Sequence, residues 1–242
     1  MSHPEAQTAP VFPLEGGCAC GNIRYSLKAA PFVVHCCHCK CCQRETGTAY
    51  ALNALVEGDD VTLLPSAPVS ASPLRAIATF PPSAFDDWTP RQSGPDSDNN
   101  TTNGNSRAHG AASDEEAQEE TTDGRFPAPV LLPVPAESGE PQLIARCPVC
   151  MTPVWSNYNG SGPLLKFLRV GTLDSPALLG GPDVHIFVRS KQPSVDLSDG
   201  KPRFDGFYPQ KEGVWRPEGL ARREKLVARI VEWSNKQAGV AR

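Results

Sequence analysis

The nine cysteines of this 242-residue chain lie in three short clusters, and their spacing is the pattern best suited to chemistry. The clusters are Cys18-Ala19-Cys20, Cys36-Cys37-His38-Cys39-Lys40-Cys41-Cys42 and Cys147-Pro148-Val149-Cys150. Two cysteines separated by one or two residues can direct both sulfurs at one ion, and zinc binds thiolates at about 2.3 Å, usually in a tetrahedron. We therefore interpret the clusters as zinc ligands.

The first and third clusters each supply one pair of thiols. Together, Cys18, Cys20, Cys147 and Cys150 would form a closed site with four thiolates, which is typical of structural zinc. Such a site would join the start of the fold to the segment that follows a long polar insertion.

The second cluster contains three thiols at both short spacings, Cys37, Cys39 and Cys42. Three protein ligands leave one coordination position for an exchangeable ligand, which is typical of catalytic zinc. Because zinc lowers the pKa of a bound thiol, this site is suited to the capture of an incoming thiol. The sequence thus predicts two zinc ions per chain, one structural and one catalytic.

Other ligand sets remain open in the second cluster. Cys36 and Cys41 are left over as packing residues or spare thiols, but an alternative register would use Cys36, Cys41 or His38 as ligands. A second purely structural zinc, completed by His35 or His38, is the main rival to the open site. Otherwise we interpret His35 as an ordinary strand residue rather than a base.

Composition limits the function classes. The net charge of −4 argues against a nucleic-acid-binding protein, which is usually basic. Residues 1–17 do not resemble a secretory signal, and no apolar run approaches the roughly 18 residues that span a bilayer. We therefore expect a soluble cytoplasmic protein, with the nucleus as an alternative, where clustered cysteines favour metal binding over disulfides.

The secondary structure is predicted to be mainly antiparallel β. Alternating or apolar stretches bounded by turn residues predict strands at 22–27, 61–64, 154–158, 164–170 and 184–188. Pro217 suits the first turn of a final helix, on which Leu220, Val227, Ile230 and Val231 recur on one side. We interpret this helix as docked on the sheet.

Three parts are predicted along the chain. Residues 1–13 form a flexible tail, residues 14–215 a zinc domain, and residues 216–242 a helix and tail. The zinc domain is interrupted by an insertion at about 67–138, within which residues 92–124 are nearly devoid of large apolar side chains. Such a segment is expected to be disordered, because it cannot bury enough apolar surface to offset the entropy of ordering.

The clusters and their flanking residues resemble the glutathione-dependent formaldehyde-activating enzyme and centromere protein V family. The resemblance depends on Gly16-Gly17-Cys18-x-Cys20-Gly21-x-Ile23-Arg24-Tyr25, on Cys37-His38-Cys39-x-x-Cys42 with Thr46-Gly47, and on Cys147-x-x-Cys150 with Thr152-Pro153. It implies a β-tent fold with the same four structural and three catalytic zinc ligands. Met151 departs from the family, which usually has Gly there, and we expect an altered turn.

The resemblance also implies an activity, the condensation of formaldehyde with glutathione by a carbon–sulfur lyase. The expected partners are therefore a small thiol and a small aldehyde, and Lys40 and Arg44 are candidates to bind a glutathione carboxylate. The alternatives are a non-enzymatic, zinc-stabilised interaction module and a redox or metal-buffering protein.

Overall fold

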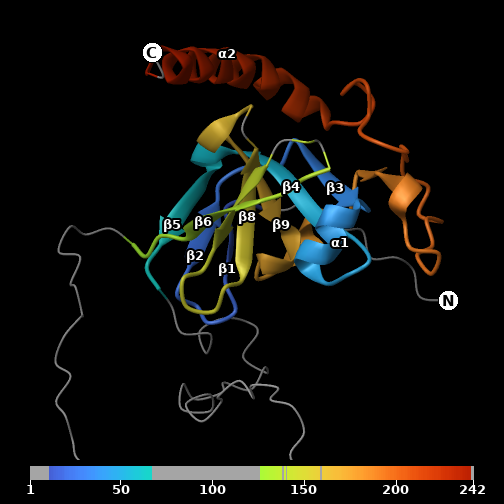
Figure 1. The fold of residues 1–242 in the computed structure, drawn as a ribbon, viewed down its shortest axis with the longest axis horizontal. Helices are drawn as coiled ribbons and strands as arrows, with labels where there is room; N and C mark the ends of the chain where they lie inside the picture. Colours follow the sequence, from blue (N-terminus) through green and yellow to red (C-terminus); the bar gives the residue numbers. More distant parts are fainter. Residues whose placement is uncertain (1–10, 67–125, 138, 140, 159, 241–242) are drawn as a thin grey trace, which may run out of the picture. The chain divides into compact units, whose positions relative to one another are not determined.

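A computed structural model of the chain describes residues 11–66, 126–137, 139, 141–158 and 160–240. These residues form two β-sheets, a short helix α1 (Lys40–Thr46) and a long C-terminal helix α2 (Pro217–Val240) (Figure 1). The prediction of a mainly β fold with a C-terminal helix is thus confirmed. Most of the predicted tail (1–13) and most of the predicted insertion (67–138) lie outside the described residues.

The smaller sheet has three antiparallel strands in the order β1-β2-β5. Their bounds are β1 (Leu14–Gly17), β2 (Arg24–Leu27) and β5 (Val61–Leu64). Gly16 lies opposite Tyr25, where a Cβ atom would come within 2.5 Å of the tyrosine hydroxyl oxygen. Glycine is therefore required for Tyr25 to lie buried beneath this sheet.

The larger sheet has seven strands in the order β10-β3-β4-β9-β8-β7-β6. Their bounds are β3 (Val33–Cys37), β4 (Ala51–Glu57), β6 (Val130–Val134), β7 (Gln142–Arg146), β8 (Pro153–Tyr158), β9 (Leu165–Arg169) and β10 (Val184–Ile186). Neighbouring strands are antiparallel except β10 and β3, which run parallel. This pair joins segments about 150 residues apart in the sequence.

The two faces of the larger sheet pack into different cores. On β3, Val34 belongs to the core shared with the smaller sheet, whereas Val33 and Cys37 belong to the core beneath α2, with Trp215 and Leu226. Because side chains alternate between the faces of a strand, neighbouring residues of β3 serve opposite faces. This alternation decides which cysteines can share a metal site.

Two predicted boundaries were wrong. The insertion was placed at 67–138, but β6 lies inside that range and pairs with β7. Pro133 concealed this strand, and it is tolerated because β6 is at the edge of the sheet. The strand predicted at 184–188 ends at Ile186, because Phe187 takes a φ of 58° and a 3₁₀ turn follows.

Helix α2 docks on the sheet region as expected, and two of the four residues predicted for its docking side, Leu220 and Ile230, pack against the core. Leu226 is buried at 2% exposure, whereas Val227 and Val231 are exposed at 38% and 54%. Arg222 fixes the docking through ion pairs to Glu57 at 3.0 Å and Asp60 at 2.8 Å. Within the described residues, no helix is both long and apolar enough to cross a membrane.

Candidate metal centres

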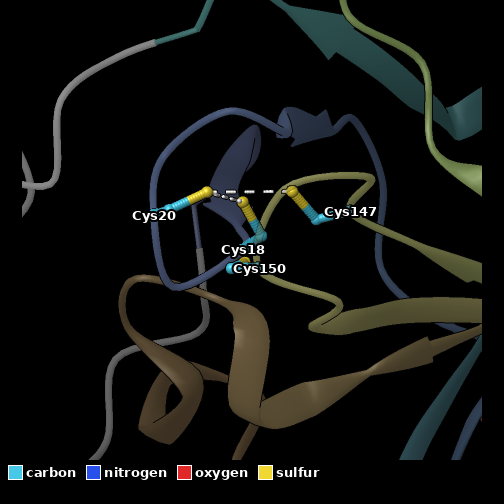
Figure 2. Close-up of side chains that lie close together, drawn as sticks. All are labelled: Cys18, Cys20, Cys147 and Cys150. Atoms are coloured by element: carbon cyan, nitrogen blue, oxygen red, sulfur yellow. Dashed lines mark hydrogen bonds between the residues drawn. The ribbon is translucent and has the colours of Figure 1, made fainter. Parts of the chain in front are cut away.

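The sulfurs of Cys18, Cys20, Cys147 and Cys150 converge on one point, and all lie within 4.8 Å of one another (Figure 2). The Sγ atoms of Cys18 and Cys20 are 3.5 Å apart, and those of Cys20 and Cys147 are 3.7 Å apart. Thiolates at about 2.3 Å from a tetrahedral zinc ion would be about 3.8 Å apart, so the group fits this metal. Burial raises the pKa of the Cys20 thiol to about 12, so a bound cation is needed to keep it ionised.

Two tight turns position these four sulfurs, and in each turn a backbone amide donates to the carbonyl of the first cysteine. In the first, the amide of Ile23 donates to Cys18 Sγ at 3.2 Å and the amide of Gly21 donates to the Cys18 carbonyl at 3.2 Å. In the second, the amide of Met151 donates to the Cys147 carbonyl at 3.0 Å.

The residue that follows the second cysteine has a positive φ in both turns, 79° at Gly21 and 59° at Met151. The turn at Met151 therefore keeps the left-handed geometry that favours glycine, and methionine adopts it at a cost.

The second group consists of Cys37, Cys39 and Cys42, whose sulfurs also lie within 4.8 Å of one another. Cys37 ends β3, Cys39 is the N-cap of α1, and Cys42 lies in the first turn of this helix. The amide of Cys42 donates to Cys39 Sγ at 3.3 Å, which ties the helix start to the cluster. All three side chains are buried, and neither His35 nor His38 joins the group.

The short distances between the three thiols of the second group limit how many of them can be ionised. Hydrogen bonds from Cys37 and Cys42 lower the pKa of the Cys39 thiol to about 2. The hydrogen bond to Cys39 raises the pKa of the Cys37 thiol well above its ordinary value. The group alone therefore favours one thiolate, and ionising all three thiols requires a cation among them.

A buried ion-pair network lies behind the second group. Glu45 of α1 accepts a hydrogen bond from Arg146 at 3.0 Å and forms an ion pair with Arg169 at 3.1 Å, and Arg169 also donates to the Asn53 side chain. Arg146 donates in addition to the Met151 carbonyl at 2.9 Å. Arg146 thus connects α1 with the turn that presents Cys147 and Cys150, and no part of this network was found from the sequence.

The second group opens onto a cavity of about 180 Å³. The cavity is lined by His35, Cys37, Cys39, Cys41, Cys42, Asn53, Ala136, Glu137, Gln142, Tyr158, Phe167, Ile186, Phe187 and Phe207. The four cysteines of the first group are not among these residues. Lys40 and Arg44, which were candidates to bind a glutathione carboxylate, lie exposed on α1 and do not line the cavity either.

Two polar side chains of the cavity wall are constrained by their surroundings. Gln142 is buried at 1% exposure, and its Oε1 atom has no hydrogen-bond partner in the described part of the chain. Trp215 donates to the Tyr208 hydroxyl at 2.6 Å, and this hydroxyl is hydrogen-bonded to His35 Nε2 at 2.8 Å. Burial lowers the pKa of His35 to about 3, and its ring is therefore neutral near pH 7.

The structure separates Cys36 and His38 from the second group and brings both to His185 on the other face of β3. The sequence predicts Cys36 as a packing residue or spare thiol, or as an alternative ligand of the second group together with His38, and it predicts His185 in a strand without a role. Cys41 lines the cavity but belongs to none of the three groups.

Comparison with known proteins agrees with the cysteine pattern. Residues 13–74 match the family described as glutathione-dependent formaldehyde-activating enzyme, which confirms the resemblance for this part of the chain. The matched segment contains the first two clusters, and the third lies beyond it. No curated protein matches the chain.

Proposed function

We propose that this chain is a zinc-dependent carbon–sulfur lyase. The premise is that residues 13–74 match the glutathione-dependent formaldehyde-activating enzyme family. Its substrates would be a small thiol such as glutathione and a small aldehyde such as formaldehyde. The reaction would form or cleave an S-hydroxymethyl-type adduct. The thiolate sulfur bonds to the aldehyde carbon, and the carbonyl oxygen takes up the proton that the thiol has lost.

The observation that carries the proposal is that only one of the two thiol-rich groups borders the cavity. Cys37, Cys39 and Cys42 line it, whereas Cys18 and Cys147 do not. We therefore assign zinc in the first group a structural role and zinc in the second a catalytic role. When bound by three thiolates, zinc would keep a substrate thiol ionised at neutral pH.

The cavity size favours small reactants. Pockets that bind drug-sized ligands usually have volumes of about 300–1,000 Å³, so a cavity of about 180 Å³ suits only the thiol end of a substrate and a small aldehyde. The rest of a peptide thiol would extend beyond the cavity. When both reactive groups are bound in one small cavity, their bimolecular reaction becomes effectively unimolecular.

The chain supplies two further features to this site. Gln142 belongs to the cavity wall, and its Oε1 atom has no hydrogen-bond partner in the described part of the chain. The guanidinium of Arg169, buried at 7% side-chain exposure, supplies positive charge close to the Cys42 thiol. This charge favours the ionised form of the Cys42 thiol.

The test is the rate of adduct exchange, because formaldehyde and glutathione also combine without a catalyst. Exchange NMR spectroscopy of an equilibrium mixture would measure this rate with increasing amounts of zinc-loaded protein. We expect the exchange rate to rise in proportion to protein concentration and to return to the background after zinc is removed. An exchange rate that does not depend on the loaded protein would exclude this activity.

A further inference from the structure

The parallel pairing of β10 with β3 creates a second polar cluster on the face opposite the cavity. His185 lies directly across from Cys36, and directly paired residues of adjacent strands project to the same face of a sheet. The amide of His38 donates to the Ile186 carbonyl at 2.9 Å, which extends the pairing one residue past β3. Cys36, His38 and His185 thus come from two segments whose relative position is fixed by backbone hydrogen bonds.

The three ligand atoms of this cluster have the separations of a metal site. Cys36 Sγ is 3.5 Å from His38 Nε2, which is 3.1 Å from His185 Nδ1, and all three atoms lie within 4.8 Å of one another. A tetrahedral zinc ion with ordinary bond lengths would hold sulfur and nitrogen about 3.5 Å apart, and two nitrogens about 3.3 Å apart. The side chains are buried, with exposures of 2%, 0% and 5%.

Asp199 supplies the orientation that a metal-binding histidine needs. Its Oδ2 atom is 2.8 Å from His185 Nε2, and its Oδ1 atom accepts from the Lys201 amide at 3.1 Å. A carboxylate on one imidazole nitrogen holds the ring proton there and leaves the other nitrogen free to coordinate. The nitrogen left free here is Nδ1, which is the atom that points at His38.

We propose that Cys36, His38 and His185 form a third metal site, for zinc or a similar first-row divalent cation, with Asp199 orienting His185. One thiolate and two imidazoles suit such borderline-soft ions. The site lies on the face of β3 opposite Cys37, so it is separate from the cavity. It does not depend on the activity proposed above.

Metal counting on the full-length chain tests the proposal. Cobalt binding would be followed by elemental analysis and by the thiolate-to-cobalt absorption band, with Cys36→Ser compared against Cys41→Ser. Cys41 is a matched control, because it lies in the same segment but belongs to none of the three groups. We expect three cobalt ions per chain for the wild type and for Cys41→Ser, and two for Cys36→Ser.

A cadmium-113 NMR spectrum of the same proteins separates loss of the site from loss of the fold. The wild type should give three resonances, and the one from the mixed sulfur–nitrogen site should lie upfield of the other two. Cys36→Ser should lose this resonance alone, and Asp199→Asn should weaken cobalt binding at this site about 10- to 100-fold. A saturated wild-type chain with only two ions would show that His38 and His185 are merely hydrogen-bonded to each other, and would overturn the proposal.

Discussion

The two groups of sulfurs proposed to bind zinc differ in how the chain assembles them. Cys18 and Cys20 meet Cys147 and Cys150 across more than a hundred residues of sequence, at the border of the core shared by the two sheets. Cys37, Cys39 and Cys42 come instead from six consecutive residues, and they line a cavity. A centre whose ligands come from distant segments holds these segments together and so stabilises the fold. A centre whose ligands are close in the sequence can lose a ligand without separating distant segments.

The largest effect is expected for Cys147→Ser. Structural zinc sites contribute on the order of 10 kcal/mol to folding in small zinc peptides, which is comparable with the whole stability of a typical domain. Loss of this ligand should therefore leave the chain mostly unfolded at 37 °C. Circular dichroism melting with excess zinc measures the effect, and a cooperative transition near that of the wild type would contradict the structural assignment.

Cys39→Ser should abolish turnover and spare the fold. We expect the adduct exchange rate to fall at least about 100-fold, because the mutation removes a ligand proposed for the catalytic zinc. The melting temperature should shift by only a few degrees. Cys41→Ser is the matched control, since it changes a cavity-lining thiol that is outside the metal groups.

The difference in stability and activity between Cys147→Ser and Cys39→Ser tests whether one centre is structural and the other catalytic. If Cys39→Ser unfolds the chain as Cys147→Ser does, both centres are structural. If both variants fold and retain exchange activity, neither centre has its proposed role.

His35→Gln should reduce the pH dependence of the free energy of unfolding, because His35 lies buried in the cavity wall. The pKa of His35 is about 3 in the folded chain and about 6.5 when unfolded, so the unfolded state binds more protons between these values. The contribution of His35 to stability is therefore complete above pH 6.5 and is lost as the pH falls toward 3. Between pH 7 and pH 5 this loss amounts to about 2 kcal/mol.

Urea unfolding of the wild type and His35→Gln with excess zinc would measure this difference. Glutamine can still accept from the Tyr208 hydroxyl, so the packing of the wall is largely preserved. Equal slopes of unfolding free energy against pH in the two proteins would show that His35 is not held neutral.

The smallest effect is expected for Met151→Gly, at the structural centre. The left-handed backbone at Met151 costs a non-glycine residue about 1–2 kcal/mol, which is partly offset by the greater entropy of glycine in the unfolded chain. We expect a gain of up to about 1 kcal/mol in the free energy of unfolding with zinc bound. The reverse change in the first turn, Gly21→Ala, should destabilise, and a stabilising Gly21→Ala would contradict the shared design of the turns.

The sequence predicted those features that depend on residues close together in the chain. The grouping of Cys37 with Cys39 and Cys42 depends on spacing alone, and the mostly apolar stretch predicted as a strand at residues 61–64 coincides with β5. His185 could not be placed, because its neighbours follow from a parallel pairing between distant segments.

Other parts of the structure were missed for related physical reasons. β6 was obscured by Pro133, which is permitted only because the strand is at the edge of the sheet. The ion pairs of Glu45 with Arg146 and Arg169 join three separate elements, and a single sequence carries no signal for them.

The alternation of β3 has a consequence for how this chain can change by insertion or deletion. Cys36 and Cys37 are neighbours in sequence but project to opposite faces, one toward His185 and the other toward the cavity. A single-codon deletion earlier in β3 that shifts its pairing by one residue would exchange the two thiols between the faces. A length change of two residues would instead preserve the face to which each thiol projects.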